Sequence, residues 1–92
     1  IRSGVVKPPQ YVRSESSTDS ATLSWEYPEE ANIQFEVFRK DSLFGIYSSV
    51  GIVSDNEFVD TDLANGVYWY RVFAKVAERV SRGSNVTKVS IP

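Results

Sequence analysis

The chain has 92 residues, the size of one small domain with a single hydrophobic core. Hydrophobic residues make up 41% of it and the formal net charge at pH 7 is −2, so a globular fold is expected and there is no basic field for phosphate groups. Nucleic acid is therefore not expected as a partner.

The sequence contains neither cysteine nor histidine. Without cysteine there are no disulfides or thiolate ligands, and without histidine the usual general base and the commonest metal ligand are missing. We therefore expect no enzyme activity, no cofactor and no metal site. The lack of disulfides fits either a sufficient core or a reducing compartment, and composition leaves both open.

The β-branched residues Val and Ile number 18, against 8 for Leu and Ala, which favours strands over helices. Residues 1–10, with the pair Pro8-Pro9, are expected to form a linker and lead-in, and residues 11–92 the domain. After a first strand near Tyr11, alternation of apolar and polar residues predicts a strand at 21–27, ended by Pro28 and Glu29-Glu30.

Five more strands are expected at 33–40, 47–53, 57–59, 67–76 and 86–91. The corner at 60–66 contains Asn65-Gly66, a pair that tolerates positive φ, and residues 77–84 read as a polar loop. No apolar run reaches about 18 residues, so we expect no membrane insertion by this segment. Seven short strands with turns between them are typical of a β-sandwich.

Four features are spaced along the chain in a fixed order: Leu23-Ser24-Trp25, residues 35–39, Leu63 with Tyr68, and Ser84-Asn85. Together they resemble the second strand, the third strand, the tyrosine corner and the start of the last strand of a fibronectin type III domain, over residues 8–92. The resemblance implies an immunoglobulin-like sandwich of seven strands, with A, B and E facing C, C′, F and G. The core expected from it is Leu23, Trp25, Phe35, Val37, Phe58, Leu63, Tyr68, Tyr70, Val72 and Ala74.

If Tyr68 and Tyr70 point inward, then Trp69 and Phe73 point outward, and Phe38 on the neighbouring strand has the same outward parity. Tyr47 extends this set if its strand lies alongside. These four aromatic residues are the candidate binding residues. The alternative is that Lys40, Arg71 and Lys75 cover the rings by cation–π packing.

Two other motifs have ordinary explanations. Asp55, Glu57, Asp60 and Asp62 cluster in the sequence, but without a pattern of calcium ligands they are expected to form a solvated edge. Asn85-Val86-Thr87 fits the acceptor pattern for N-glycosylation, although Ser84-Asn85 is also ordinary for this strand of the family.

The resemblance implies a non-catalytic structural or protein-interaction module of a multidomain extracellular or cell-surface protein, acting as a spacer or in cell adhesion. Its expected partners are other proteins or neighbouring domains. The alternative is an accessory module of a secreted carbohydrate-active enzyme. For that reading glycan contact would need a row of exposed aromatic rings, which the sequence alone does not establish.

Overall fold

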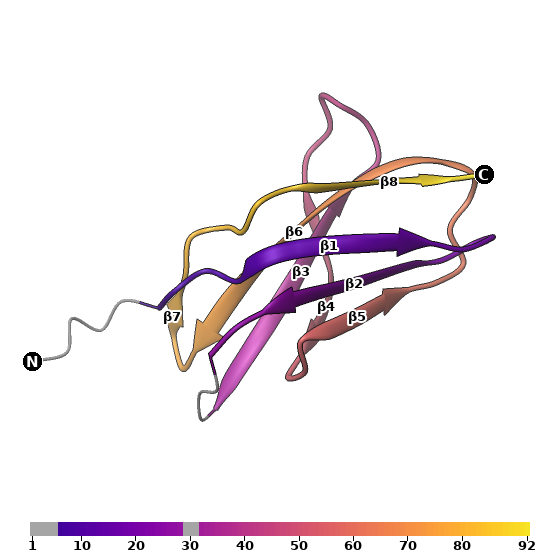
Figure 1. Cartoon of the computed structure of the whole chain (residues 1–92). Helices are drawn as coiled ribbons and strands as arrows, with labels where there is room; N and C mark the ends of the chain where they lie inside the picture. Colours follow the sequence, from indigo (N-terminus) through magenta and orange to yellow (C-terminus); the bar gives the residue numbers. More distant parts are fainter. Residues whose placement is uncertain (1–5, 29–31) are drawn as a thin grey trace, which may run out of the picture.

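The computed structural model describes residues 6–28 and 32–92 and consists of two antiparallel β-sheets packed against each other (Figure 1). The first sheet has the order β1-β2-β5, with bounds Gln10–Ser16, Ala21–Glu26 and Glu57–Asp60. The second has the order β4-β3-β6-β7, with β8 also paired to β6. Its strands are β3 (Ile33–Lys40), β4 (Ser48–Val53), β6 (Gly66–Val76), β7 (Arg79–Val80) and β8 (Thr87–Ile91).

This arrangement confirms the predicted all-β, immunoglobulin-like sandwich, with strands A, B and E (β1, β2, β5) facing C, C′, F and G (β3, β4, β6, β8). Figure 1 shows β1 and β8 running side by side at one margin, where the two sheets meet. In the part of the chain that the structure describes, no helix is long and apolar enough to cross a membrane.

A single core fills the space between the sheets because alternate residues of each strand point inward. Edge-to-face packing of Trp25 on Phe35, with ring centroids 5.3 Å apart, joins the first sheet to the second. The buried apolar residues are Val12, Ala21, Leu23, Trp25, Phe35, Val37, Leu63, Tyr68, Tyr70, Val72, Ala74, Val89 and Ile91. Nine of the ten expected core residues are among them, and four further members come from β1, β2 and β8.

Phe58 was the exception, because it is only partly buried and packs against the margin of the core. Its ring lies over Gly51 of β4, where any side chain would collide with it. The missing side chain of Gly51 therefore provides the space for Phe58, near the open side of the sandwich.

The predicted polar loop at 77–84 was partly wrong, because it contains β7. Ala77 adopts a left-handed conformation with φ of 55°, which turns the chain back so that Val80 pairs with Lys75 of β6. A tight turn at a non-glycine residue gives little sequence signal, and two residues are too few for an alternation pattern.

Between β7 and β8, two buried serines replace the missing ladder along β6. Ser81 N–H donates to the carbonyl of Ala74 at 2.8 Å, and the N–H of Ala74 donates to Ser81 Oγ at 2.9 Å. Ser84 makes the same pair of bonds with Val72, both at 2.9 Å. The serines thus satisfy backbone groups of β6 that no strand covers.

The described part of the expected lead-in packs against the sandwich. β1 begins at Gln10, Pro9 is buried and Val6 packs against the core. Residues 1–5 of the expected linker and the Glu29-Glu30 pair lie outside the described residues. Within β1, an irregular register between Gln10 and Arg13 places Tyr11 at a positive φ of 54°.

Candidate interaction surface

The four aromatic residues proposed for binding come together on the outer surface of the second sheet. β3 and β6 pair so that Lys40 stands opposite Trp69, Phe38 opposite Arg71, and Glu36 opposite Phe73. Their neighbours along each strand, such as Phe35, Val37, Tyr70 and Val72, point into the core, so this set points out. We call Phe38, Tyr47, Trp69 and Phe73, with Lys40 and Arg71, the aromatic–cation face.

Two cations lie across the rings of this face. The Arg71 guanidinium is 5.3 Å from the Phe73 centroid and 5.7 Å from that of Tyr47. Lys40 Nζ is 5.0 Å from the centroid of Tyr47 and 5.8 Å from that of Trp69. All four rings are partly buried, so the cations cover them in part and leave the remainder accessible.

The rest of the face is fixed by packing and by one ion pair. Phe38 and Phe73 pack edge to face, with centroids 5.2 Å apart. Lys75, which was expected to cover a ring, instead pairs with Glu36 at 3.5 Å. Arg71 lies against Gly83, where a side chain would collide with the guanidinium, and its buried Nε has no hydrogen-bond partner among the described residues.

Charge is distributed unevenly between the outer surfaces of the two sheets. The second sheet presents four cations, Lys40, Arg71, Lys75 and Lys88, with Glu36 as an acidic neighbour. The alternation of the first sheet places Arg13, Glu15, Glu26 and Glu57 on its outer surface. A chain of net charge −2 therefore presents a positive face on one side and a negative face on the other.

Asp60 was expected on a solvated acidic edge, and this was wrong. It is buried, and its Oδ2 accepts hydrogen bonds from Arg39 Nη1 at 2.8 Å and from the Tyr70 hydroxyl at 2.7 Å. Asp60 follows inward-facing Phe58 by two residues, and Arg39 follows Val37 by two, so strand parity could have shown that both side chains point inward, although not that they meet.

The triad of Asp60, Arg39 and Tyr70 changes the titration of two of its members. Burial raises the pKa of the Tyr70 hydroxyl far above its usual range, and the hydrogen bond to Asp60 and its charge raise it further, against the opposing effect of Arg39. Burial alone would lower the pKa of Arg39, but the hydrogen bond and charge of Asp60 outweigh it and raise that pKa. These groups lock β3, β5 and β6 together rather than facing a ligand.

The other members of the acidic cluster, Asp55, Glu57 and Asp62, are exposed. Within residues 6–28 and 32–92, no group of three or more potential metal-ligating side chains lies close enough to hold an ion.

The residues expected to mark the family occupy structural positions. Leu23, Trp25, Leu63 and Tyr68 are all buried. The Tyr68 hydroxyl donates to the carbonyl of Ala64 at 2.7 Å, and Leu63 N–H donates to the carbonyl of Asp19 at 2.8 Å. The corner before β6 is thereby tied to β6 and to the turn between β1 and β2, with Asp62 rather than Asn65 in the left-handed conformation at φ of 60°.

The Asn85 side chain, just before β8, hydrogen-bonds to the backbone of β1 and so links the two sheets. Its Oδ1 accepts from Val12 N–H at 3.0 Å, and its Nδ2 donates to the Val12 carbonyl at 2.9 Å. The side chain therefore takes the place of a neighbouring strand beside β1. Glycosylation at Asn85 stays a prediction from the sequence.

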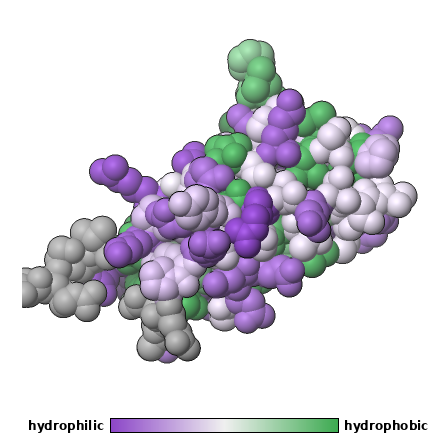
Figure 2. Space-filling view, viewed as in Figure 1, coloured by the Kyte–Doolittle hydropathy of each residue, from purple (hydrophilic) through white to green (hydrophobic). Residues whose placement is uncertain are grey.

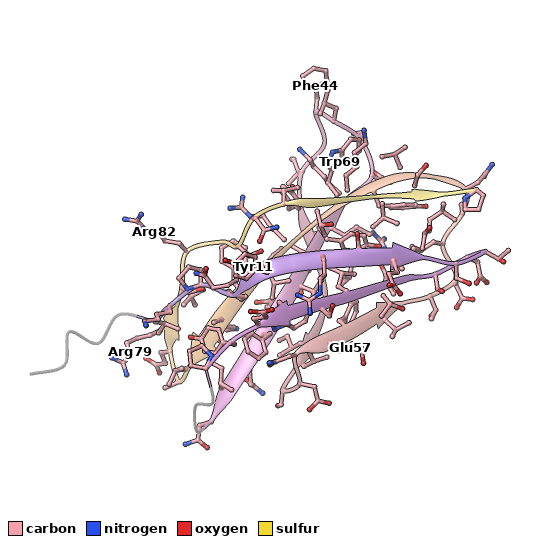
Figure 3. The ribbon with its side chains drawn as sticks, in the orientation of Figure 1. Tyr11, Phe44, Glu57, Trp69, Arg79 and Arg82 are labelled. Carbon is pink, nitrogen blue, oxygen red and sulfur yellow. The ribbon has the colours of Figure 1, made fainter. Side chains whose placement is uncertain are left out.

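Sequence reasoning missed the loop between β3 and β4. Its tip exposes Leu43 (59%), Phe44 (95%) and Ile46 (89%), and a turn closed by Gly45 N–H donating to the Ser42 carbonyl at 3.0 Å shapes it. Figure 3 shows Phe44 at the end of this loop, with Trp69 beneath it. The available signal was an apolar run, Leu43-Phe44-Gly45-Ile46, inside a predicted turn.

No family model and no curated protein matches the chain at a significant level. Among solved structures, titin domains A168–A170 share 21% identity and a TM-score of 0.82, over 95% of this chain and 32% of theirs. An Fn3-like protein from Clostridium thermocellum shares 24% identity and a TM-score of 0.76 over 91% of both chains.

The β-1,2-glucanase from Parabacteroides distasonis shares 15% identity and a TM-score of 0.82, over 95% of this chain and 13% of that one. The chain thus spans about a third of the titin fragment and a smaller part of the glucanase. With two sheets of matching topology, one shared core and a tyrosine corner, the chain has the fold of a fibronectin type III domain.

Proposed function

We propose that the chain is a non-catalytic module of a multidomain extracellular or cell-surface protein, and that its aromatic–cation face contacts another protein or a neighbouring domain. The observation that carries this proposal is the gathering of four partly exposed rings around Lys40 and Arg71 on one sheet surface. Aromatic residues and arginine are the side chains most enriched at the centres of protein interfaces.

The shape of the module supports a second role as a spacer. It measures 49 × 24 × 18 Å, and β1 begins near one end of the long axis while β8 ends near the other (Figure 1). Neighbouring domains joined at these ends would be held apart by the length of the sandwich.

Substitution of Trp69 and Phe38 by alanine tests the contact. In each variant we expect association with the native partner or the adjoining domain to weaken by about tenfold or more, because each ring is an interface anchor. Both side chains point away from the core, so the fold should remain intact by circular dichroism. Val59→Ala on the first sheet, half exposed, is the matched control.

Unchanged association in both ring variants would contradict the proposed face. Association weakened equally by Val59→Ala would also contradict it, because the effect would then not belong to this surface.

An accessory role in a secreted carbohydrate-active enzyme is the second candidate, favoured by the match of this fold to part of a glucanase chain. Against direct glycan contact, Phe38 and Phe73 meet at 77° and cations overlie the rings, so the face offers no flat row for sugar stacking. Affinity electrophoresis in soluble polysaccharides tests it: retardation that Trp69→Ala abolishes would replace the protein contact with a glycan contact.

A further inference from the structure

The loop between β3 and β4 forms an apolar projection that the proposed function does not use. Phe44 and Ile46 are almost fully exposed, and Leu43 is more than half exposed. Figure 2 shows this projection as an apolar knob where Figure 1 places the loop. A convex tip of three large apolar side chains is costly in water, because the rest of the sandwich leaves most of their surface uncovered.

Cations stand in one row directly below the tip. Strand register places Lys40 opposite Trp69, and Trp69 opposite Lys88, across β3, β6 and β8. Lys40 Nζ also donates to the Leu43 carbonyl at 2.9 Å, which ties the loop to this row. Arg71 lies one step further down the sheet, and Asp41 at the loop base is the opposing charge.

We propose that this end of the module docks onto an anionic lipid surface, with Leu43, Phe44 and Ile46 entering the interface and Lys40, Lys88 and Arg71 contacting acidic headgroups. An apolar tip above a cationic row matches a lipid surface, where apolar side chains enter about 5–10 Å into the boundary between headgroups and acyl chains and cations contact the acidic headgroups. Trp69 lies in the same row, and tryptophan favours the headgroup level. A convex knob needs a preformed recess in a protein partner, but a fluid interface accommodates it without one.

The inference goes beyond the proposed protein contact and changes one expectation. The sequence predicted no membrane insertion because it lacks a long apolar run, and a short apolar loop tip at the interface does not depend on such a run.

Flotation with lipid vesicles tests the docking. We expect the wild-type chain to float with vesicles containing about one-third phosphatidylserine and not with pure phosphatidylcholine, and binding should fall several-fold when salt is raised about fivefold. Phe44→Ser with Ile46→Ser should weaken binding at least about tenfold, and Lys88→Glu several-fold. Val59→Ser, an apolar substitution of a half-exposed residue on the other sheet, should have no effect.

A second readout places the tip in the lipid. In Phe44→Trp combined with Trp69→Phe, the new indole should shift its emission to shorter wavelength when phosphatidylserine vesicles are added, whereas the buried Trp25 does not respond. Absence of vesicle binding, binding independent of phosphatidylserine, or no shift in this double variant would overturn the proposal. Concentration-dependent self-association abolished by the serine variants, without vesicle binding, would assign the tip to a second copy instead.

Failure of this inference is distinguishable from failure of the proposed function. Phe38 belongs to the aromatic–cation face but not to the tip or the cation row, so Phe38→Ala should weaken the protein contact and leave flotation unchanged.

Discussion

Tyr68 and Tyr70 both point into the core from β6, but their hydroxyls have different partners. Tyr68 donates to a backbone carbonyl at an exposed corner, whereas Tyr70 donates to the buried carboxylate of Asp60. Hydrogen bonds to charged groups contribute more than those to neutral groups, and water can replace a partner only where it has access. The two hydroxyls should therefore differ in their contribution to stability.

We expect Tyr70→Phe to lower the free energy of unfolding by about 2 kcal/mol and Tyr68→Phe by about 1 kcal/mol. Urea denaturation of the two variants and of the wild type measures the difference. Equal losses, or no loss in either, would show that neither the corner nor the triad contributes as its geometry indicates.

Tyr70 also predicts how stability depends on pH. Its pKa is raised in the folded state, so above pH of about 10 the unfolded chain loses this proton while the folded chain keeps it. The stabilisation that comes from this raised pKa is fully present below that pH. As pH rises further it is lost, and the free energy of unfolding falls by up to about 1.4 kcal/mol per pH unit. Tyr70→Phe should flatten this alkaline decline in urea denaturation, whereas Tyr11→Phe, at an exposed tyrosine, should leave its slope as in the wild type.

For single residues, strand alternation predicted which side chains point inward but not which groups their polar atoms hydrogen-bond to. Arg39 and Asp60 lie on strands of different sheets, and their contact depends on how the sheets stack. Alternation along one strand contains no information about that distance.

Among the elements, β6 depends on side chains as well as strands for its hydrogen bonds. β8 pairs with its first half and β7 with its last two residues, and Ser84 and Ser81 fill the interval. The sequence predicted β8 but no role for the two serines, because Ser81 and Ser84 lie five and eight residues beyond the end of β6, inside a predicted polar loop.

Ser84→Ala should therefore leave the buried N–H of Val72 without a partner. We expect a loss of about 1–3 kcal/mol, measured by thermal or urea denaturation, and faster amide exchange at Val72. Ser90→Ala, on the exposed side of β8, is the control and should change stability by less than about 0.5 kcal/mol. Equal effects would mean that water enters this interval.

For the whole molecule, the same alternation that predicted the core also predicted one of the two candidate surfaces, the aromatic–cation face. The outward parity of Phe38, Trp69 and Phe73 followed from the sequence, and the covering of rings by Lys40 and Arg71 was the alternative that it left open. The apolar tip at Leu43 to Ile46 was not predicted. An apolar run without helix or strand periodicity does not indicate whether its side chains are buried or exposed.

Two substitutions of a large aromatic residue by alanine, one in the core and one at the loop tip, should have opposite effects on stability. Trp25 fills the space between the sheets and contacts Phe35, whereas Phe44 is 95% exposed. Trp25→Ala should cost about 3–5 kcal/mol, a large part of the stability of a small domain, and should shift the transition seen by fluorescence and circular dichroism together.

Trp25→Phe should cost less than Trp25→Ala, because the indole Nε1 has no hydrogen-bond partner among the described residues and only volume is lost. Phe44→Ala should change the urea midpoint by little, since its ring contributes no buried area to the fold. A midpoint unchanged in Trp25→Ala would remove the core assignment, and a large loss in Phe44→Ala would show that the tip packs against the sandwich in solution.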